Sequence, residues 1–156
     1  MSYIDYYFST ISPFSYLAGD RLETIAAKYG ATITYKPVDV LALFARTGGL
    51  PPGERHPSRQ KYRVQELRRQ SKKTNLPLKL QPQYFPTNAA PSSYAVIAAQ
   101  NDGSGDLGAL VRALFTRFLW LRTAPLGNPV VPEVYWICAA SSGWTSARLA
   151  GRSPKT

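Results

Sequence analysis

The sequence has very few of the residues that bind metals or form disulfides. Its 156 residues include one cysteine, Cys138, one histidine, His56, and one methionine. A lone cysteine cannot form an intramolecular disulfide, and one histidine with one cysteine falls short of the ligands that a zinc site needs. We therefore expect no disulfide framework and no metal centre, and the cysteine content fits a reducing, cytoplasmic compartment.

Long apolar runs are absent as well. No segment approaches the roughly 18 consecutive apolar residues that indicate a membrane-spanning helix. Residues 1–5 contain no basic stretch followed by an apolar one, so they do not resemble a secretory signal. We expect a cytoplasmic protein without membrane association, long enough to form one domain with a hydrophobic core.

Acidic residues are scarce, and the resulting positive charge is concentrated in one segment. Nine Asp and Glu stand against 19 Lys and Arg, and residues 54–73 hold eight basic and two acidic side chains, a net charge of +6. The segment has one aromatic residue, Tyr62, and no known nucleic-acid motif, which disfavours nucleic acid as a partner. Val64 and Leu67 make too narrow an apolar face for a membrane surface. A solvated face is the simplest interpretation.

Periodicity and turn residues predict a strand, a helix and a second strand, followed mainly by helices. The strands are expected at 3–8 and 31–37, with a helix at 13–29 that Gly30 ends. The later elements are an amphipathic helix at 38–46, a basic helix at 58–75 capped by Ser58, an extended segment at 76–86, a helix at 92–100, and a last helix capped by Asp106.

The segment 12–18 joins the first strand to the first helix and is the most informative stretch. Ser12 is a good helix cap, and Pro13 suits the first helical position. Unpaired N–H groups and the helix dipole converge there, so the turn can hold an anion such as a thiolate. Ser12 and Ser15 have the spacing of a Cys-x-x-Cys motif, but two serines exclude a disulfide oxidoreductase.

Asp5-Tyr6-Tyr7-Phe8, followed by Ser-Pro-Phe-Ser-Tyr-Leu-Ala at 12–18, resembles the 2-hydroxychromene-2-carboxylate isomerase family. Kappa-class glutathione transferases and the wider DsbA-like thioredoxin superfamily are its relatives. Further matches occur in family order at 35–40, 48–52, 59–63, 66–67, 76–78 and 84–86. The segment 9–11 departs from the family, in which many members carry an acidic residue soon after the strand.

The resemblance implies an α/β, thioredoxin-like fold with an all-helical DsbA-type insertion. It places a βαβ unit at 1–40 and the helical insertion at 41–120. Residues 121–156 do not resemble the family, and we expect an irregular tail in place of the C-terminal ββα half. Our hypothesis is a shift of reading frame near residues 119–122. Loss of sheet partners would expose strand edges and favour aggregation.

The resemblance also implies a glutathione-dependent isomerase of aromatic degradation, with glutathione as cofactor and a small aromatic carboxylate as substrate. In that family the glutathione thiolate is thought to add to a conjugated bond, permit rotation and leave. Ser12 would stabilise this thiolate. It is not expected to act as a nucleophile, because His56 has no evident acidic partner.

Other site residues follow from the same resemblance. Glutathione is expected at Ser12, Phe14, Gly49 and Pro51, and the substrate carboxylate at Lys36 and Arg63. Each residue also has a simpler interpretation: a helix cap for Ser12, core packing for Phe14, a plain turn at 49–51, and a solvated pair of Lys36 with Asp39. Gly49 replaces an asparagine of the kappa-class relatives, so a side-chain contact is lost.

Two alternative functions stay open. The first is an inactive, truncated remnant of this family. The second is an anion-binding module that uses the basic helix at 58–75. Kappa-class relatives form dimers, which adds a homodimer to the expected assemblies.

Overall fold

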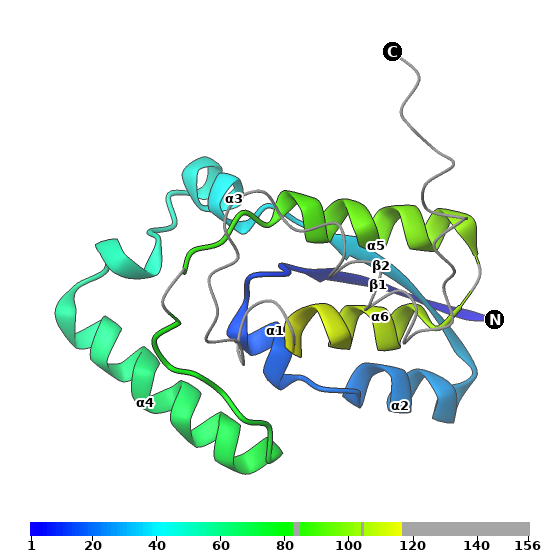
Figure 1. Cartoon of the computed structure of the whole chain (residues 1–156), viewed down its shortest axis with the longest axis horizontal. Coiled ribbons are helices and arrows are strands. Elements are labelled where there is room, and N and C mark those ends of the chain that lie inside the picture. Colours follow the sequence, from blue (N-terminus) through cyan, green and yellow to red (C-terminus); the bar gives the residue numbers. More distant parts are fainter. Residues whose placement is uncertain (83–84, 104, 117–156) are drawn as a thin grey trace.

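The computed structural model describes residues 1–82, 85–103 and 105–116, and Figure 1 shows their arrangement. Its centre is a parallel pair of strands, β1 (Ser2–Phe8) and β2 (Ala31–Pro37), aligned from Ser2 opposite Ala31 to Phe8 opposite Pro37. Parallel pairing requires a crossover between the strands, and helices provide it. Both predicted strands are thus confirmed to within one residue.

Two helices form this crossover instead of the single helix predicted at 13–29. They are α1 (Pro13–Leu17) and α2 (Arg21–Tyr29). Gly19 lies between them with φ +62°, a left-handed conformation that interrupts the helical hydrogen bonds. Gly30, with φ +61°, ends α2 as predicted. The prediction of one continuous helix was wrong because the helix-breaking role of Gly19 was missed.

The other regular elements of the described chain are helical. They are α3 (Val40–Thr47), the short 3₁₀ turn η1 (Pro52–Glu54), α4 (Pro57–Thr74), α5 (Ala90–Asp102) and α6 (Leu107–Leu114). Asp39 caps α3 by accepting from two backbone N–H groups, and Asp106 caps α6 as predicted. The cap of α4 is His56, whose Nδ1 accepts from the Ser58 N–H, so the predicted Ser58 cap was wrong.

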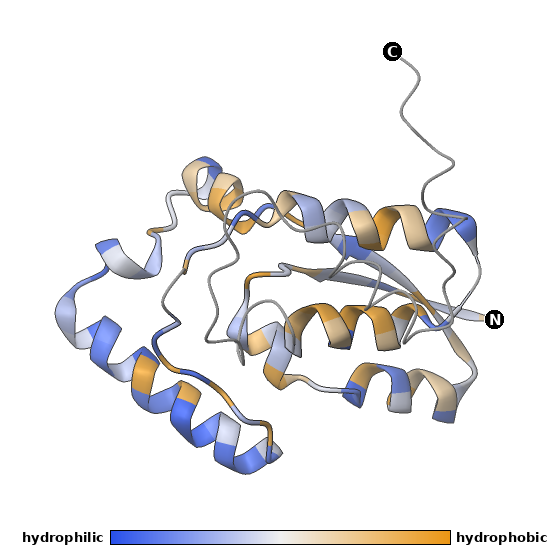
Figure 2. Cartoon of the chain, viewed as in Figure 1, coloured by the Kyte–Doolittle hydropathy of each residue, from blue (hydrophilic) through white to orange (hydrophobic). Residues whose placement is uncertain are grey.

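The core lies between the strands and the helices. Helix α5 packs against β2 and α6, whereas α4 sits at one end of the molecule and contacts α1 (Figure 1). Figure 2 shows α6 as largely apolar and α4 as largely polar. Phe8 meets Tyr35 and Phe115 edge to face, with ring centroids 6.2 and 6.1 Å apart. The buried cluster comprises Phe8, Tyr16, Leu17, Tyr35, Leu67, Val96, Ala99, Leu110, Val111, Leu114 and Phe115.

Gln100 of α5 caps the outer edge of β2. The Tyr35 N–H donates to its Oε1 at 2.7 Å, and its Nε2 donates to the Tyr35 carbonyl at 3.2 Å. The amide therefore takes the hydrogen bonds that a neighbouring strand would take at this residue. Such a contact satisfies backbone groups that the strand edge would otherwise leave unpaired.

We predict that Gln100→Leu lowers the free energy of unfolding by about 1–3 kcal/mol, because it leaves a backbone donor and a backbone acceptor without partners. Gln100→Glu keeps an acceptor for the Tyr35 N–H but sets a carboxylate oxygen against the Tyr35 carbonyl, so at neutral pH it should destabilise as well. Urea denaturation followed by circular dichroism measures both variants. A Gln100→Leu protein within about 0.5 kcal/mol of the wild type would show that water replaces the contact freely.

Within the described ranges, no helix is long and apolar enough to cross a membrane. The expected tail at 121–156 and the hypothesis of a frame shift concern residues outside the described part of the chain.

Candidate functional site

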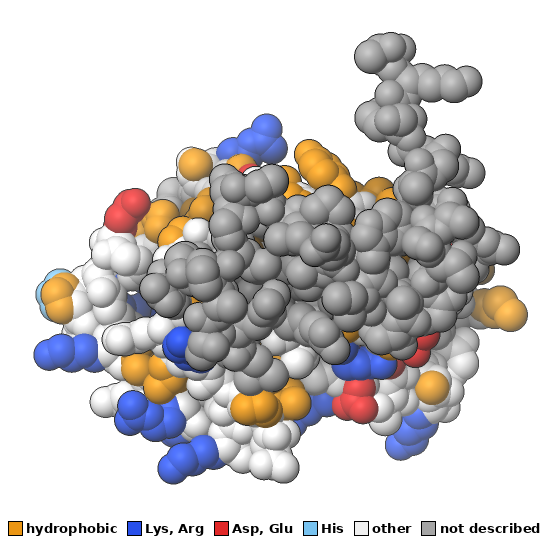
Figure 3. Space-filling model, viewed as in Figure 1, with side chains coloured by type: hydrophobic (Ala, Val, Ile, Leu, Met, Phe, Trp, Pro, Cys, Tyr) orange, Lys and Arg blue, Asp and Glu red, His pale blue; other side chains and the backbone are white. Residues whose placement is uncertain are grey.

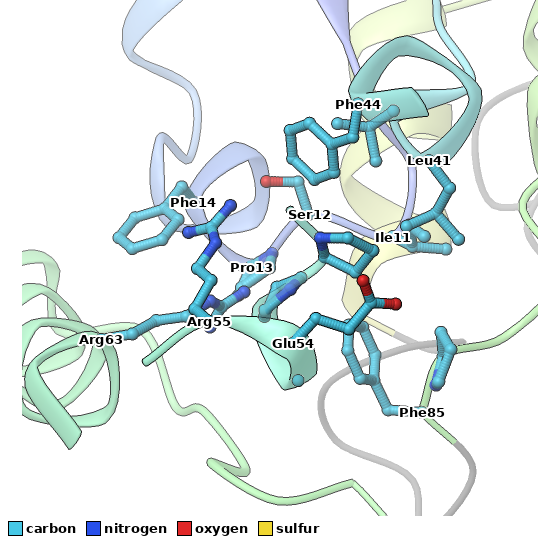
Figure 4. A pocket seen from close by; sticks show the side chains of 15 residues that line it. Ile11, Ser12, Pro13, Phe14, Leu41, Phe44, Glu54, Arg55, Arg63 and Phe85 are labelled. Carbon is cyan, nitrogen blue, oxygen red and sulfur yellow. The ribbon is translucent and has the colours of Figure 1, made fainter. Parts of the chain in front are cut away.

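A cavity of about 480 Å³ lies beside the first turn of α1 (Figure 4). Most of its lining is aliphatic, aromatic or proline, and its charged members are Glu54, Arg55 and Arg63. Such a wall suits a ligand that is partly apolar and carries negative charge. The lining residues are 11–14, Val40, Leu41, Phe44, 51–55, Arg63 and 85–86.

Ser12 occupies the position where β1 gives way to α1. It has extended backbone angles, φ −86° and ψ 120°, and its Oγ accepts from the Ser15 N–H at 3.3 Å. Accepting this bond engages a lone pair of the oxygen and not its hydrogen, so the hydroxyl can still donate to an anion. Figure 4 shows this hydroxyl turned to the side of the cavity on which Phe44 lies.

The helix behind Ser12 is short. With five residues, α1 sums fewer peptide dipoles than the 17-residue helix that the sequence predicted. The dipole of α1 should therefore stabilise an anion here less than the predicted long helix would. Ser15, the second serine of the motif, does not line the cavity and instead interacts with the Tyr6 hydroxyl.

Arg63 supplies positive charge to the cavity from α4. Its guanidinium carbon lies 5.5 Å from the centroid of the Phe14 ring, a cation–π arrangement. Burial, and secondarily the charge of Arg55, lower the pKa of Arg63. Among the ion pairs of the described residues none includes Arg63. A partly desolvated cation without a carboxylate partner favours the binding of an anion.

Arg55 forms the neighbouring part of the same wall. Its guanidinium carbon lies 5.6 Å from the Phe44 ring centroid, and its Nε donates to the Leu50 carbonyl at 2.9 Å. In Figure 4, Arg55 and Arg63 approach the cavity on the side of Phe14, away from Leu41. The two rings and the two guanidinium groups thus frame the opening beside Ser12.

Four of the six predicted site residues line this cavity: Ser12, Phe14, Pro51 and Arg63. Gly49 is not among the lining residues. Its N–H donates to the Phe44 carbonyl at 2.9 Å, and a Cβ at this position would lie 2.8 Å from the Phe44 ring. The glycine therefore allows Phe44 to take its place in the wall.

Lys36 lies elsewhere. Its Nζ is 2.6 Å from Asp5 Oδ2 and 3.4 Å from the Tyr7 hydroxyl, and it does not line the cavity. The hydrogen bond to Asp5, followed by that to Tyr7, raises the pKa of Lys36. Lys36 does form an ion pair, but its partner is Asp5 of the paired strand β1, whereas Asp39 caps α3.

Sequence reasoning missed several lining residues, above all Phe44, Arg55 and Phe85. Phe44 belongs to a helix predicted as amphipathic, and Arg55 was counted in the basic segment. The sequence thus indicated the character of each residue but not that it lines this cavity. Within the described residues, no group of three or more His, Cys, Asp or Glu is placed to hold a metal ion.

A family model described as the DSBA-like thioredoxin domain matches residues 3–150. The chain belongs to the DSBA-like thioredoxin family. The resemblance stated from the sequence is therefore confirmed, as is the thioredoxin-like fold class. The match extends beyond residue 120, and the predicted domain boundaries at 40 and 120 stay predictions.

Named relatives of this DSBA-like chain include isomerases and a transferase. It is 33% identical over 118 residues to a 2-hydroxychromene-2-carboxylate isomerase of Sphingobium xenophagum, covering 75% of this chain and 57% of that protein. A 2-hydroxychromene-2-carboxylate isomerase of Pseudomonas putida is 42% identical over 52 residues, which cover 33% of this chain and 26% of the Pseudomonas protein. Glutathione S-transferase kappa 1 of Caenorhabditis elegans is 34% identical over 76 residues, which cover 48% of this chain and 33% of the transferase.

A solved structure of 2-hydroxychromene-2-carboxylate isomerase, with selenomethionine, resembles this DSBA-like chain with a TM-score of 0.63 and 27% sequence identity. The alignment covers 95% of this chain and 68% of the solved one. The chain thus spans little more than half the length of the Sphingobium relative and about two thirds of the solved structure.

Proposed function

We propose that this DSBA-like protein is a glutathione-dependent isomerase of the 2-hydroxychromene-2-carboxylate type, acting on a small aromatic carboxylate. The observation that carries the proposal is the meeting of the Ser12 hydroxyl, the Phe14 ring and Arg63, which forms no ion pair within the described residues, in one largely apolar cavity. The names of the relatives support the reaction type. A homodimer and a cytoplasmic location stay predictions of the sequence.

The donor set fits glutathione, a peptide with a thiol and two carboxylates. When bound, glutathione would supply a thiolate for reversible addition to a conjugated bond. The hydroxyl of Ser12 would donate to that sulfur and favour its anionic form. Arg63 would pair with a carboxylate, of the peptide or of the substrate. The apolar wall would exclude water and strengthen both interactions.

We predict that Ser12→Ala raises the pKa of the bound glutathione thiol and lowers isomerase turnover by ~100-fold, the size typical of removing one donor to a reacting anion. Ultraviolet absorbance of the thiolate against pH measures the pKa, and consumption of 2-hydroxychromene-2-carboxylate measures turnover. Calorimetric titration gives the affinity for glutathione.

Ser15→Ala is the matched control, because its hydroxyl does not line the cavity. Ser12→Ala also removes a helix cap, which costs about 1 kcal/mol of stability, so circular dichroism must show that the variant is folded. A folded Ser12→Ala protein with unchanged thiol pKa and turnover would reduce Ser12 to a helix cap. Absence of glutathione binding by the wild type would favour an inactive relative of the family.

Anion binding by α4 is the second candidate function. Figure 3 shows Lys and Arg side chains spread over the region of α4. The described residues show no ion pair for Lys61, Arg68 or Lys72, which lie on its exposed side. Salt-sensitive retention on heparin would favour this role, whereas indifference to heparin would dismiss it.

A further inference from the structure

The chain between α3 and α4 forms one wall of the cavity. The side chain of Gln60, in α4, forms hydrogen bonds with this wall. All residues of the segment 51–55 line the cavity. The Gln60 Nε2 donates to the Gly53 carbonyl at 2.9 Å and to the Arg55 carbonyl at 2.7 Å. An amide nitrogen carries two hydrogens, so both donors of Gln60 are engaged.

The other hydrogen bonds of the segment 51–55 are local. The Glu54 N–H donates to the Pro51 carbonyl at 3.0 Å, and Arg55 Nε donates to the Leu50 carbonyl. These bonds shape the turn but do not join it to a helix. Beyond the capping turn of α4, the Gln60 side chain is the polar link that the described residues show between the wall and that helix.

The same helix carries Arg63, three residues after Gln60 and therefore on a neighbouring part of the same face. A rigid helix that holds the wall through Gln60 also sets where Arg55 stands relative to Arg63. The charge of Arg55 contributes to the lowered pKa of Arg63, so the two cations repel each other. Gln60 opposes the movement of the wall that would relieve this repulsion.

We propose that Gln60 is a positioning residue of the site, which does not line the cavity but holds the wall 51–55 in register with Arg63. Where the ligand is glutathione, the inference rests on the proposed function. The positioning itself is a property of the free protein. It can therefore be measured without any ligand.

Three substitutions test the role of the donors. Gln60→Leu has a similar size and no donor, Gln60→Glu sets a carboxylate against two carbonyl oxygens, and Gln60→Lys keeps a donor. Gln65→Leu is the matched control, because Gln65 is exposed on the same helix. For Gln60→Leu we expect amide hydrogen exchange of Glu54, whose N–H donates to the Pro51 carbonyl within this wall, to become ~10-fold faster. The dissociation constant of glutathione should rise ~10-fold, since two hydrogen bonds are lost.

In the exchange measurement Gln60→Glu should exceed the effect of Gln60→Leu, and Gln60→Lys should return the rate to within ~3-fold of the wild type. Glutathione affinity is compared for Gln60→Leu alone, because the new charge of the Glu and Lys variants acts on an anionic ligand directly. A general loss of stability would not produce this order. Exchange of the Glu54 amide that is equal in Gln60→Leu and wild type would overturn the proposal, as would equal affinity of these two proteins for glutathione. If Gln60→Leu does not fold, the comparison of the Lys and Glu variants decides. If the wild type binds no glutathione, the proposed function fails. Hydrogen exchange in the free protein still tests whether Gln60 positions the wall 51–55.

Discussion

Replacing Arg63 by methionine should weaken the binding of glutathione by ~10- to 100-fold, the loss expected for one hydrogen bond to a charged group. Methionine keeps much of the length and apolar surface of the side chain but removes the cation. The guanidinium lies over the Phe14 ring, is partly desolvated and has no carboxylate partner within the described residues. Its charge is therefore available to a ligand. Isothermal calorimetry measures the change.

The same substitution should leave the free energy of unfolding unchanged or raise it. Folding takes the charge of Arg63 partly out of water, and the pKa of Arg63 falls as a result. Removing this cation therefore removes a desolvation cost together with the weaker attraction to the Phe14 ring. Arg68→Met on the exposed side of α4 is the control and should change neither quantity. Unaltered glutathione affinity in Arg63→Met would place the anion elsewhere in the cavity.

Leu67→Ala should be the most destabilising of these substitutions, lowering the free energy of unfolding by about 2–5 kcal/mol, as deletion of a buried leucine side chain does. Leu67 is 1% exposed and belongs to the main buried cluster. It is the buried residue of α4, whose other side chains are mostly polar. Denaturation in urea should show a lower midpoint with an unchanged slope.

Leu67→Ala should also affect the candidate site, because α4 carries both Gln60 and Arg63. A cavity beneath α4 would loosen the attachment of the helix to the core, so glutathione affinity should fall as well. Leu43→Ala is the control: Leu43 is 47% exposed on α3, does not line the cavity, and should change stability by no more than about 0.5 kcal/mol. A loss below about 1 kcal/mol for Leu67→Ala would mean that α4 is anchored by other contacts.

Much of the fold was predictable because its signals are local. Alternating and periodic apolar residues gave both strands and the positions of the helices, and Asp106 and Gly30 marked a helix start and a helix end. The break at Gly19 was missed. A glycine with helical neighbours does not reveal its φ angle, which is set by how α1 and α2 must each pack.

Some residues of the candidate site were also predictable from local sequence, and others were not. Ser12 and Phe14 were predictable, since they lie in one continuous motif beside the first strand. Lys36 was not, because its choice of Asp5 over Asp39 depends on the pairing of β1 with β2. Arg63 was proposed by resemblance alone, and only the packing of α4 places it over Phe14.

The sequence by itself determined the family, the order of strand and helix, the serine that caps α1 and the concentration of positive charge in α4. Tertiary structure alone decided which of these charges faces the cavity, that Gln100 caps β2 and that Gln60 holds the wall. The reason is physical. Propensity, capping and periodicity act over a few neighbouring residues, whereas burial and side-chain contacts depend on segments that only folding brings together.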